Sequence, residues 1–427
     1  MKIYIKTYGC SANQNDSEIM AALLKKKGRK LVNSIEEADI VLVNTCAVKG
    51  KTESQIANYL RKIWQRYPSK KYIIAGCLPQ VRYDLVKSII KKGALLNPHQ
   101  IDEINKIVNE ISQNKFLEHL DKKFSAKANM PKLRINPLIN IVQINEGCAG
   151  FCSFCITKLA KSKLYSALEK DIIEDIKKSI KNGCKEIWLT SQDTGAYGKD
   201  NKNNLAELLK NIVEIKGNFY VRIGMINPDN VKPILSELIE LYKNPKIFKF
   251  LHMPIQSGND AILKKMNRKY SIKDCENIIK KFRKNIPNLT LSTDIICGFP
   301  GESEKQFNDS IKLIKKIKPD TINISRFWGR PGTKAALMPN QINGAITKKR
   351  STKLSEIHHR IALEKNKKWM GWKGRVLIDE KGKNNTWKGR NFAYKQVIVK
   401  SSRNLFKKKM NVKITDASPI DLRAEIM

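Results

Sequence analysis

Short apolar runs alternate with amphipathic stretches along the first third of the chain. The runs with strand character are Lys2–Thr7, Ile40–Asn44 and Tyr72–Ala75. The stretches between them with a helical spacing of apolar residues are Asp16–Lys27 and Thr52–Tyr67. Strands that alternate with helices predict a parallel, doubly wound sheet. A short helix over 101–111 and a Lys-rich connection over 114–134 are expected to follow.

The middle of the chain repeats this alternation six times. The apolar runs are Ile139–Ile144, Glu186–Thr190, Phe219–Met225, Ile247–Met253, Leu289–Ile296 and Thr321–Phe327. The helical stretches are Ala167–Asn182, Asn204–Ile215, Val231–Leu241, Ala261–Met266, Ile272–Lys284 and Glu304–Ile317. Six such units predict an open partial (β/α)6 barrel, with its chemistry at the carboxyl ends of the strands.

The last part of the chain changes character. A loop over 335–343 and a long basic helix over 348–368 precede three strand-like runs, which are Gly374–Asp379, Asn391–Val399 and Met410–Ala417. Short strands of this kind predict a small C-terminal β-barrel. The patterns together divide the chain into an N-terminal domain (1–118), a linker (119–136), a central domain (137–365) and the C-terminal barrel (366–427).

The composition adds a strong positive charge to this picture. The 427 residues include 81 Lys and Arg and 40 Asp and Glu, a formal net charge of +41. Such a charge favours a polyanionic partner, although a Lys-rich proteome is the plainer explanation. Residues 367–427 carry 16 Lys and Arg against 5 Asp and Glu, a net +11. Their interleaved aromatic residues suit single-stranded nucleic acid, unless they form the core of the small barrel.

The chain contains nothing that predicts export or membrane insertion. No apolar run approaches the roughly 18 residues of a membrane helix. The first residues enter a strand directly and do not form a signal peptide. Nine cysteines without secretion predict metal ligands or free thiols in a reducing compartment. We therefore expect a cytoplasmic protein.

Three cysteines at C-x3-C-x2-C spacing, Cys148, Cys152 and Cys155, follow the first strand of the central domain, and we call them the loop triad. A structural zinc site usually has four ligands, and no second pair lies nearby. Three thiolates on a four-iron cluster leave one iron open to a small molecule. A buried loop with coincidental cysteines is the alternative. Phe151 and Phe154 are expected to shield the site from solvent.

A second set of cysteines, Cys10, Cys46 and Cys77, follows three separate strands of the N-terminal sheet, and we call it the sheet triad. The carboxyl ends of parallel strands lie at one edge of a sheet, where ligands bind. The three thiols are therefore expected to converge on a second metal site. The alternative is three unrelated buried cysteines, because cysteine is among the most buried residue types.

The segments around both triads resemble the radical S-adenosylmethionine (SAM) methylthiotransferase family. The matching segments are Tyr8–Asp16, Asn44–Gly50, Ala75–Pro79, Glu186–Gly198, Arg222–Met225, Pro254–Gly258 and Asp294–Glu302. Residues 366–427 are similar in position to the TRAM domain, an RNA-binding barrel of this family. The resemblance covers almost the whole chain.

This resemblance implies two [4Fe–4S] clusters and two molecules of SAM per turnover. The cluster on the loop triad, whose cysteines are the expected catalytic residues, would cleave SAM to a 5′-deoxyadenosyl radical. The cluster on the sheet triad would hold the sulfur or methylthio group, and the second SAM would supply the methyl group. A low-potential electron donor and a sulfur donor are the implied protein or small-molecule partners.

The resemblance also implies residues that contact SAM. Thr190, Ser191 and Gln192 are similar to the residues that bind the amino group of its methionine. Asp294 and Gly298 lie in a stretch that resembles the lining of its adenine and sugar. For Asp294, as for the nearby Glu302, a solvated or capping carboxylate is the alternative.

One segment departs from the family pattern. Relatives often carry Ala-Arg-Gly shortly after the third cysteine of the loop triad, whereas this chain reads Ala160-Lys161-Ser162. Lysine keeps the charge and cannot make the bidentate contact of arginine. The role of the family's arginine is therefore in doubt in this chain.

Within the family, three of the segments are most similar to the archaeal and eukaryotic branch, which modifies threonylcarbamoyladenosine beside the anticodon, at position 37 of tRNA. The implied substrate is a tRNA anticodon stem-loop. Other branches modify isopentenyladenosine in tRNA or an aspartate of a ribosomal protein. Two hypotheses of other kinds are a non-catalytic iron–sulfur RNA-binding protein and a radical SAM enzyme that uses its second cluster only for electrons.

Overall fold

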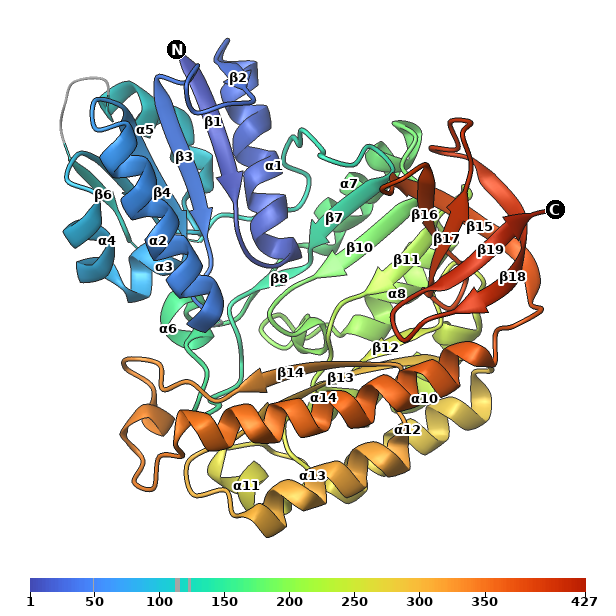
Figure 1. Ribbon diagram of the computed structural model, residues 1–427. Helices are drawn as coiled ribbons and strands as arrows, with labels where there is room; N and C mark the ends of the chain where they lie inside the picture. Colours follow the sequence, from blue (N-terminus) through green and yellow to red (C-terminus); the bar gives the residue numbers. More distant parts are fainter. Residues whose placement is uncertain (49, 112–115, 122–123) are drawn as a thin grey trace.

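The structure is a computed structural model that describes residues 1–427 except 49, 112–115 and 122–123. Lys49 of the second cysteine segment, and residues 112–115 and 122–123 around the expected connection, lie outside the described residues. Figure 1 shows an N-terminal sheet, a central set of strands with helices outside it, and a C-terminal barrel.

The N-terminal part is a six-stranded parallel sheet in the order β2-β1-β3-β4-β5-β6. The strands are β1 (Lys2–Thr7), β2 (Lys30–Val32), β3 (Ile40–Thr45), β4 (Lys71–Gly76), β5 (Gly93–Leu96) and β6 (Leu117–His119). The helices are α1 (Ser11–Lys26), α2 (Gly50–Arg66), α3 (Cys77–Val81), α4 (Tyr83–Ile89) and α5 (Ile104–Ile111). Separate apolar cores lie on the two faces, one under α1 and α5 and one under α2 and α4. The doubly wound sheet is confirmed.

The first helix begins five residues earlier than predicted. We expected Asp16 near its start, but α1 begins at Ser11, directly after Cys10. The Asn13 side chain donates to the carbonyl oxygens of Tyr8 and Thr45, at 2.9 and 2.8 Å, from within the helix. These contacts hold the start of α1, where Cys10 at the N-cap position makes no side-chain capping hydrogen bond. The strands β2, β5 and β6 were not predicted, because three or four residues carry too little periodicity.

The central part contains the six predicted parallel strands, in two groups joined by a bridge between Val221 and Ile247. The strands are β7 (Ile139–Gln143), β10 (Glu186–Thr190), β11 (Tyr220–Ile223), β12 (Phe250–His252), β13 (Thr290–Cys297) and β14 (Thr321–Arg326). The helices are α7 (Glu169–Lys181), α8 (Leu205–Glu214), α10 (Leu235–Lys243), α11 (Asp260–Lys265), α12 (Ile272–Asn285) and α13 (Glu304–Ile317). The open (β/α) barrel is confirmed.

One predicted helix of this part is broken. The stretch 231–241 spans the end of α9 (Pro228–Val231), a short 3-10 turn (Lys232–Ile234) and α10. Pro233 lies in that turn and lacks the amide hydrogen that a continuous helix needs.

The long helix α14 (Gly344–Lys367) leads into a closed barrel in the order β15-β16-β17-β19-β18. The strands are β15 (Lys373–Lys381), β16 (Thr386–Arg390), β17 (Gln396–Lys400), β18 (Lys409–Ala417) and β19 (Leu422–Ile426). The barrel is confirmed, but the strand predicted over 391–399 begins only at Gln396. Asn391–Lys395 is a turn, with Tyr394 at a φ of 61°. The strands β16 and β19 were not predicted. The domain boundaries stay a prediction. The last strand of the N-terminal sheet, β6, ends at His119, one residue after the predicted boundary at residue 118.

Candidate active site

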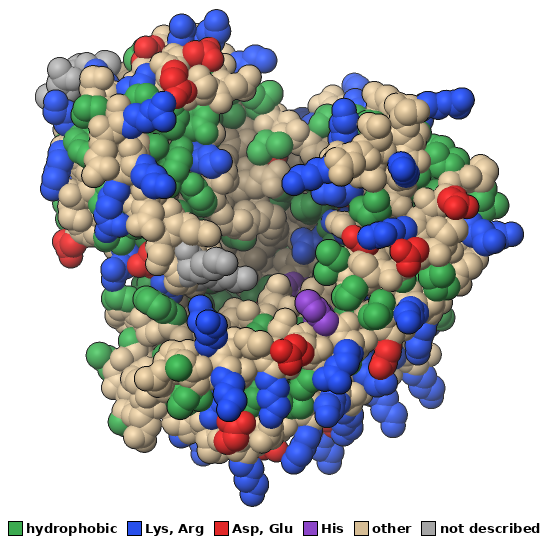
Figure 2. All heavy atoms as spheres, in the orientation of Figure 1, with side chains coloured by type: hydrophobic (Ala, Val, Ile, Leu, Met, Phe, Trp, Pro, Cys, Tyr) green, Lys and Arg blue, Asp and Glu red, His purple; other side chains and the backbone are tan. Residues whose placement is uncertain are grey.

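The two cysteine triads flank the contact between the N-terminal sheet and the central strands. Figure 2 shows a hollow between the N-terminal part, at upper left, and the C-terminal barrel, at right. The amino end of α1 meets the carboxyl ends of β7 and β10 here. The side chain of Ser11 lies 2.7 Å from Thr190 (Oγ to Oγ1), and Gln143 Nε2 donates to the carbonyl oxygen of Ala12 at 3.0 Å. Cys10 of the sheet triad and Cys148 of the loop triad lie within five residues of these contacts in the sequence.

The loop triad follows β8 (Asn145–Glu146), a short strand directly after β7. The Gly150 amide donates to Cys148 Sγ at 3.2 Å. A Cβ atom on Gly150 would lie 3.4 Å from Cys148 Sγ and 3.8 Å from Cys152 Sγ, so both sulfurs face the same glycine. Burial raises the pKa of Cys148 to about 11 and raises the pKa of Cys155 as well. The shielding expected from Phe151 is wrong, because that ring is 68% exposed.

The sheet triad lies at the ends of three neighbouring strands. Cys10 follows β1, Cys46 follows β3, and Cys77 follows β4 as the first residue of α3. A Cβ atom on Gly9 would lie only 2.8 Å from the Cβ of Cys46, so the first two segments touch. Cys46 and Cys77 are buried, and burial raises the pKa of Cys77 to about 12. The structure therefore brings these three thiols to one edge of the sheet.

The donor chemistry of both triads fits an iron–sulfur cluster. Buried thiols stay protonated at neutral pH, whereas a bound metal deprotonates them. Among the described residues, no three Cys, His, Asp or Glu side chains stand close enough to enclose a single metal ion. A four-iron cluster is larger, and each of its cysteines binds a different iron atom, so its thiolates stand farther apart.

The residues expected to bind the methionine of SAM follow β10. Thr190 is buried and contacts Ser11 of α1, and the Ser191 hydroxyl accepts the Asp193 amide at 3.0 Å. Gln192 Oε1 is buried and has no hydrogen-bond partner in the described part of the chain. Of the three side chains, Gln192 has an acceptor available for a ligand.

Asp294 and Gly298, on and after β13, have different surroundings. The two carboxylate oxygens of Asp294 each lie 3.3 Å from His252 Nε2, and Asn323 Nδ2 donates to one of them at 2.6 Å. Gly298 has a φ of +79°, and a Cβ atom there would lie 2.1 Å from Thr347 Cγ2 of α14. The close packing against α14 thus explains why a residue without a side chain is needed at position 298. Glu302 is buried, accepts the Gly298 amide at 2.8 Å and pairs with Arg350, so the solvated alternative is wrong for this residue, and the N-cap of the following helix α13 is Ser303.

Known proteins similar to this chain decide its family. The family described as "Radical SAM superfamily" matches residues 142–314, and "Uncharacterized protein family UPF0004" matches residues 2–96. A protein of Pyrococcus horikoshii named "Probable threonylcarbamoyladenosine tRNA methylthiotransferase" is 43% identical over 406 residues, which cover 94% of each chain. The human "Threonylcarbamoyladenosine tRNA methylthiotransferase" is 35% identical over 97% of this chain and 72% of its own length. This chain belongs to the threonylcarbamoyladenosine tRNA methylthiotransferase family.

Solved structures of radical SAM enzymes share the fold of this chain. The methyltransferase TsrM from Kitasatospora setae, with cobalamin and a [4Fe–4S] cluster bound, superposes with a TM-score of 0.55 at 12% identity and covers 78% of this chain and 76% of its own. The cobalamin-dependent enzyme OxsB superposes with a TM-score of 0.53 at 10% identity and covers 92% and 63%. Membership of the radical SAM superfamily implies a [4Fe–4S] cluster and SAM.

Sequence reasoning missed an arginine that contacts the loop triad. Arg268 Nη1 donates to Cys152 Sγ at 3.0 Å, and Arg268 Nε donates to the Tyr270 hydroxyl at 2.7 Å. Arg268 also donates to Asn227, whose amide donates to the buried Asp193. Burial raises the pKa of Asp193, and hydrogen bonds from Asn227 oppose this shift. The arginine lies outside every recognised motif, so only the fold reveals its contact with the loop triad.

None of the described helices combines the length and the apolar composition needed to cross a bilayer.

Proposed function

We propose that this chain methylthiolates N6-threonylcarbamoyladenosine at position 37 of tRNA and forms the 2-methylthio derivative. The supporting observation is the pairing of two cysteine triads across one contact, where the helix that starts beside Cys10 meets the strand end at Thr190. An aromatic C–H bond is too inert for a side-chain base, so a cofactor must supply the reactivity while the protein positions the substrate. The names of the relatives from archaea and animals support this substrate.

The residues have distinct roles in this proposal. The loop triad holds the cluster that, when bound, supplies the electron for cleavage of SAM. Gly150 and Arg268 donate hydrogen bonds to the sulfurs of this triad and orient them. The sheet triad would hold the second cluster, which would supply the sulfur atom that is inserted. Gln192 and Asp294 offer acceptor oxygens to SAM, Thr190 and Ser191 line the same strand end, and Gly298 lets the chain turn beside it.

The proposed partners follow from the chemistry and the charge. The reaction requires a low-potential electron donor and a sulfur donor, because each turnover uses electrons and sulfur that the chain itself does not supply. The tRNA anticodon stem-loop enters the hollow, and the C-terminal barrel (366–427) binds it as a TRAM-like domain. In this proposal the rest of the chain consists of the N-terminal domain (1–118), the linker (119–136) and the radical SAM core (137–365).

Mass spectrometry of tRNA nucleosides tests the proposal. Reconstituted protein is incubated anaerobically with SAM, a reductant, sulfide and tRNA that carries threonylcarbamoyladenosine, and isopentenyladenosine tRNA is treated in parallel. A methylthio mass gain on the first tRNA alone is expected. A gain only on the second would overturn the substrate, and SAM cleavage without either product would point to a protein substrate or another radical reaction. A protein without SAM cleavage would be the non-catalytic alternative.

Iron content tests the number of clusters. Two [4Fe–4S] clusters correspond to about eight iron atoms per chain, and one cluster to about four. About four irons in protein that still makes the methylthio product would overturn the role of the sheet triad.

A further inference from the structure

Helix α6 (Thr157–Lys161) belongs to the loop that carries three cysteines but packs into the N-terminal part of the chain. It begins two residues after Cys155. Its Ala160 is buried in the same apolar cluster as Cys77 and Leu78, the first two residues of α3. The peptide that leaves the loop triad is therefore anchored beside a cysteine of the sheet triad.

Lys161, the last residue of α6, lies in a buried ionic network at this junction. Its Nζ lies 2.8 Å from Glu146 Oε1 and 3.7 Å from Asp16 Oδ2. Lys127 contacts the same two carboxylates, at 2.6 Å from Glu146 and 2.7 Å from Asp16. The four side chains are 1–6% exposed. Two ammonium groups thus balance two carboxylates, as buried charges require.

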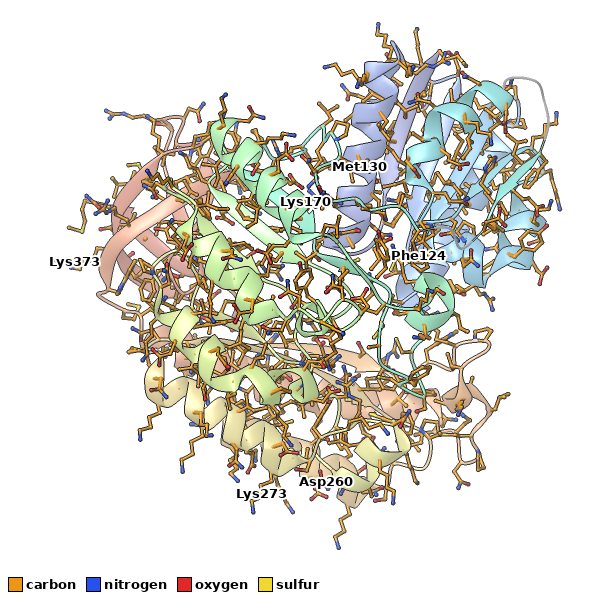
Figure 3. The ribbon with its side chains drawn as sticks, turned by 180° about the vertical axis from the view of Figure 1, so that it is seen from behind. Phe124, Met130, Lys170, Asp260, Lys273 and Lys373 are labelled. Carbon is orange, nitrogen blue, oxygen red and sulfur yellow. The ribbon has the colours of Figure 1, made fainter. Side chains whose placement is uncertain are left out.

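The members of this network come from segments that lead to both triads. Asp16 lies on α1, which begins at the residue after Cys10, and Glu146 lies two residues before Cys148. His99, from the loop after β5, also contacts Glu146, with Nδ1 2.9 Å from Oε2. Lys127 comes from the connecting segment. Figure 3 labels Phe124 and Met130 on this segment, between the N-terminal sheet and the central strands. The Phe124 ring packs between the rings of His99 and Tyr165, with centroids 4.3 and 5.6 Å apart.

We propose that Lys161 is a positioning residue that holds the two cysteine triads at a set separation. Its ammonium group joins the strand that enters the loop triad (Glu146) to the helix that leaves the first cysteine of the sheet triad (Asp16). Its backbone is held beside Cys77 by the packing of α6. A point charge that contacts two carboxylates does not need the bidentate geometry of arginine, so lysine can perform this task. The inference rests on the proposed two-cluster function.

Misplacement of the sheet triad would reduce the methylthio product and leave the formation of 5′-deoxyadenosine unchanged. SAM cleavage needs only the loop triad, whereas sulfur insertion needs both triads at the substrate. Misalignment of reacting groups by about 1 Å can cost on the order of 100-fold in rate. Loss of the Lys161 charge should therefore uncouple the two reactions.

The test compares Lys161→Met and Lys161→Arg in the reconstituted full-length protein. We expect Lys161→Met to bind iron and form 5′-deoxyadenosine at near wild-type rates, while methylthio product falls about 100-fold. Pulsed electron paramagnetic resonance of the reduced protein should show altered dipolar coupling between the two clusters. Lys161→Arg should restore the coupling and the product. Lys395→Met is the matched control, because Lys395 is another buried lysine, paired with Asp320 at 2.7 Å in the C-terminal part, far from the cysteines in sequence.

Unchanged coupling and unchanged product in Lys161→Met would overturn the inference. The same result in Lys395→Met as in Lys161→Met would also overturn it, because any buried lysine would then suffice. If Lys161→Met does not fold, the charge-balanced double variant Lys161→Met/Glu146→Gln decides, and wild-type coupling in that variant refutes the role of Lys161. Failure of the proposed function itself would be visible earlier, as a wild-type protein without product or with about four irons.

Discussion

Arg268 contacts Cys152 although 116 residues separate them in the chain. Its guanidinium group is fixed by Tyr270 on one side and Asn227 on the other, so its donor points at the sulfur. Hydrogen bonds and positive charge at a cysteine sulfur adjust the potential and the stability of an iron–sulfur cluster. A single side chain can therefore influence SAM cleavage without touching SAM.

Replacing Arg268 by Gln should slow the formation of 5′-deoxyadenosine by about 10- to 100-fold, the usual effect of losing a group that orients a metal ligand. Iron content should stay near the wild-type value, since all three cysteines remain. Arg268→Lys, which keeps the charge without the fixed geometry, serves as the comparison. Wild-type cleavage by Arg268→Gln would contradict the orienting role.

The two triads should respond differently to loss of one cysteine. Cys152→Ala should abolish 5′-deoxyadenosine, because a loop triad with two thiolates cannot hold its cluster open to SAM. Cys46→Ala should keep SAM cleavage and lose the methylthio product, with iron reduced from about eight to about four per chain. Product analysis and iron assay on the same samples check both expectations. Retained cleavage in Cys152→Ala would show that the roles are assigned wrongly.

The turn between β16 and β17 attaches the C-terminal barrel to the central strands. Tyr394 packs against Phe248 and Phe250, with ring centroids 4.9 and 5.0 Å apart, and against Trp188 of β10 at 6.4 Å. Glu186 of β10 accepts a hydrogen bond from Trp188 Nε1 at 2.9 Å and lies close enough to Asp379 of β15 for the two carboxylates to repel each other. Burial raises the pKa of Glu186 to about 7 and the pKa of Asp379 to about 6.

The two buried carboxylates, Glu186 and Asp379, make the free energy of unfolding depend on pH in a defined direction. The unfolded pKa values of Glu and Asp are about 4, so the folded protein binds more protons between pH 4 and the raised values. The free energy of unfolding should therefore fall as pH rises from about 4 to about 7. Glu186 contributes at most about 4 kcal/mol of this loss, since folding raises its pKa by about 3 units and one unit is about 1.4 kcal/mol.

Anaerobic thermal unfolding between pH 5 and pH 7 checks this expectation. The Tm of the wild type should fall across this range, and the Tm of Glu186→Gln should fall less, because the glutamine cannot ionise. Parallel curves for the two proteins would show that Glu186 does not titrate on folding.

At the scale of the whole molecule, Lys and Arg residues occur in all three parts of the chain. Lys and Arg side chains are spread over the face in Figure 2, and Figure 3 shows Lys373 on the barrel and Lys273 on the outer helices. The net charge of +41 therefore does not locate the tRNA by itself. Removing the whole barrel would also expose the apolar contacts of Tyr394. Substitutions on its surface are the cleaner test.

Neutralising exposed cations of the barrel should weaken tRNA binding and reduce its salt dependence. The variant replaces by Gln three exposed residues of the β17–β18 segment, Lys400, Arg403 and Lys408. If all three contact phosphates, the slope of log affinity against log salt should fall by about 2 to 3. The control makes the same change in charge on the outer helix α12, at Lys273, Lys280 and Lys284. Equal slopes for both variants would show that the barrel has no special part in binding.

The sequence by itself determined the elements whose information is local. The six central strands, the closed C-terminal barrel and the doubly wound N-terminal sheet follow from runs of apolar residues with a regular period. The loop triad was visible because its three cysteines are close in sequence. The sheet triad was predictable from topology, since parallel strands end at one edge. Short strands such as β2 and β6, and the turn at Asn391–Lys395, were not predictable, because a few residues carry no period.

Only the tertiary structure decided which side chains meet across these elements. Lys161 joins carboxylates from two different parts of the chain, Arg268 reaches Cys152, and Tyr394 enters the central strands. These contacts depend on the relative placement of elements that lie tens to hundreds of residues apart, and hydrophobic periodicity does not encode that placement. Lys161 illustrates the difference. The sequence shows only a lysine near a cysteine motif, whereas the fold shows a buried charge that two carboxylates balance.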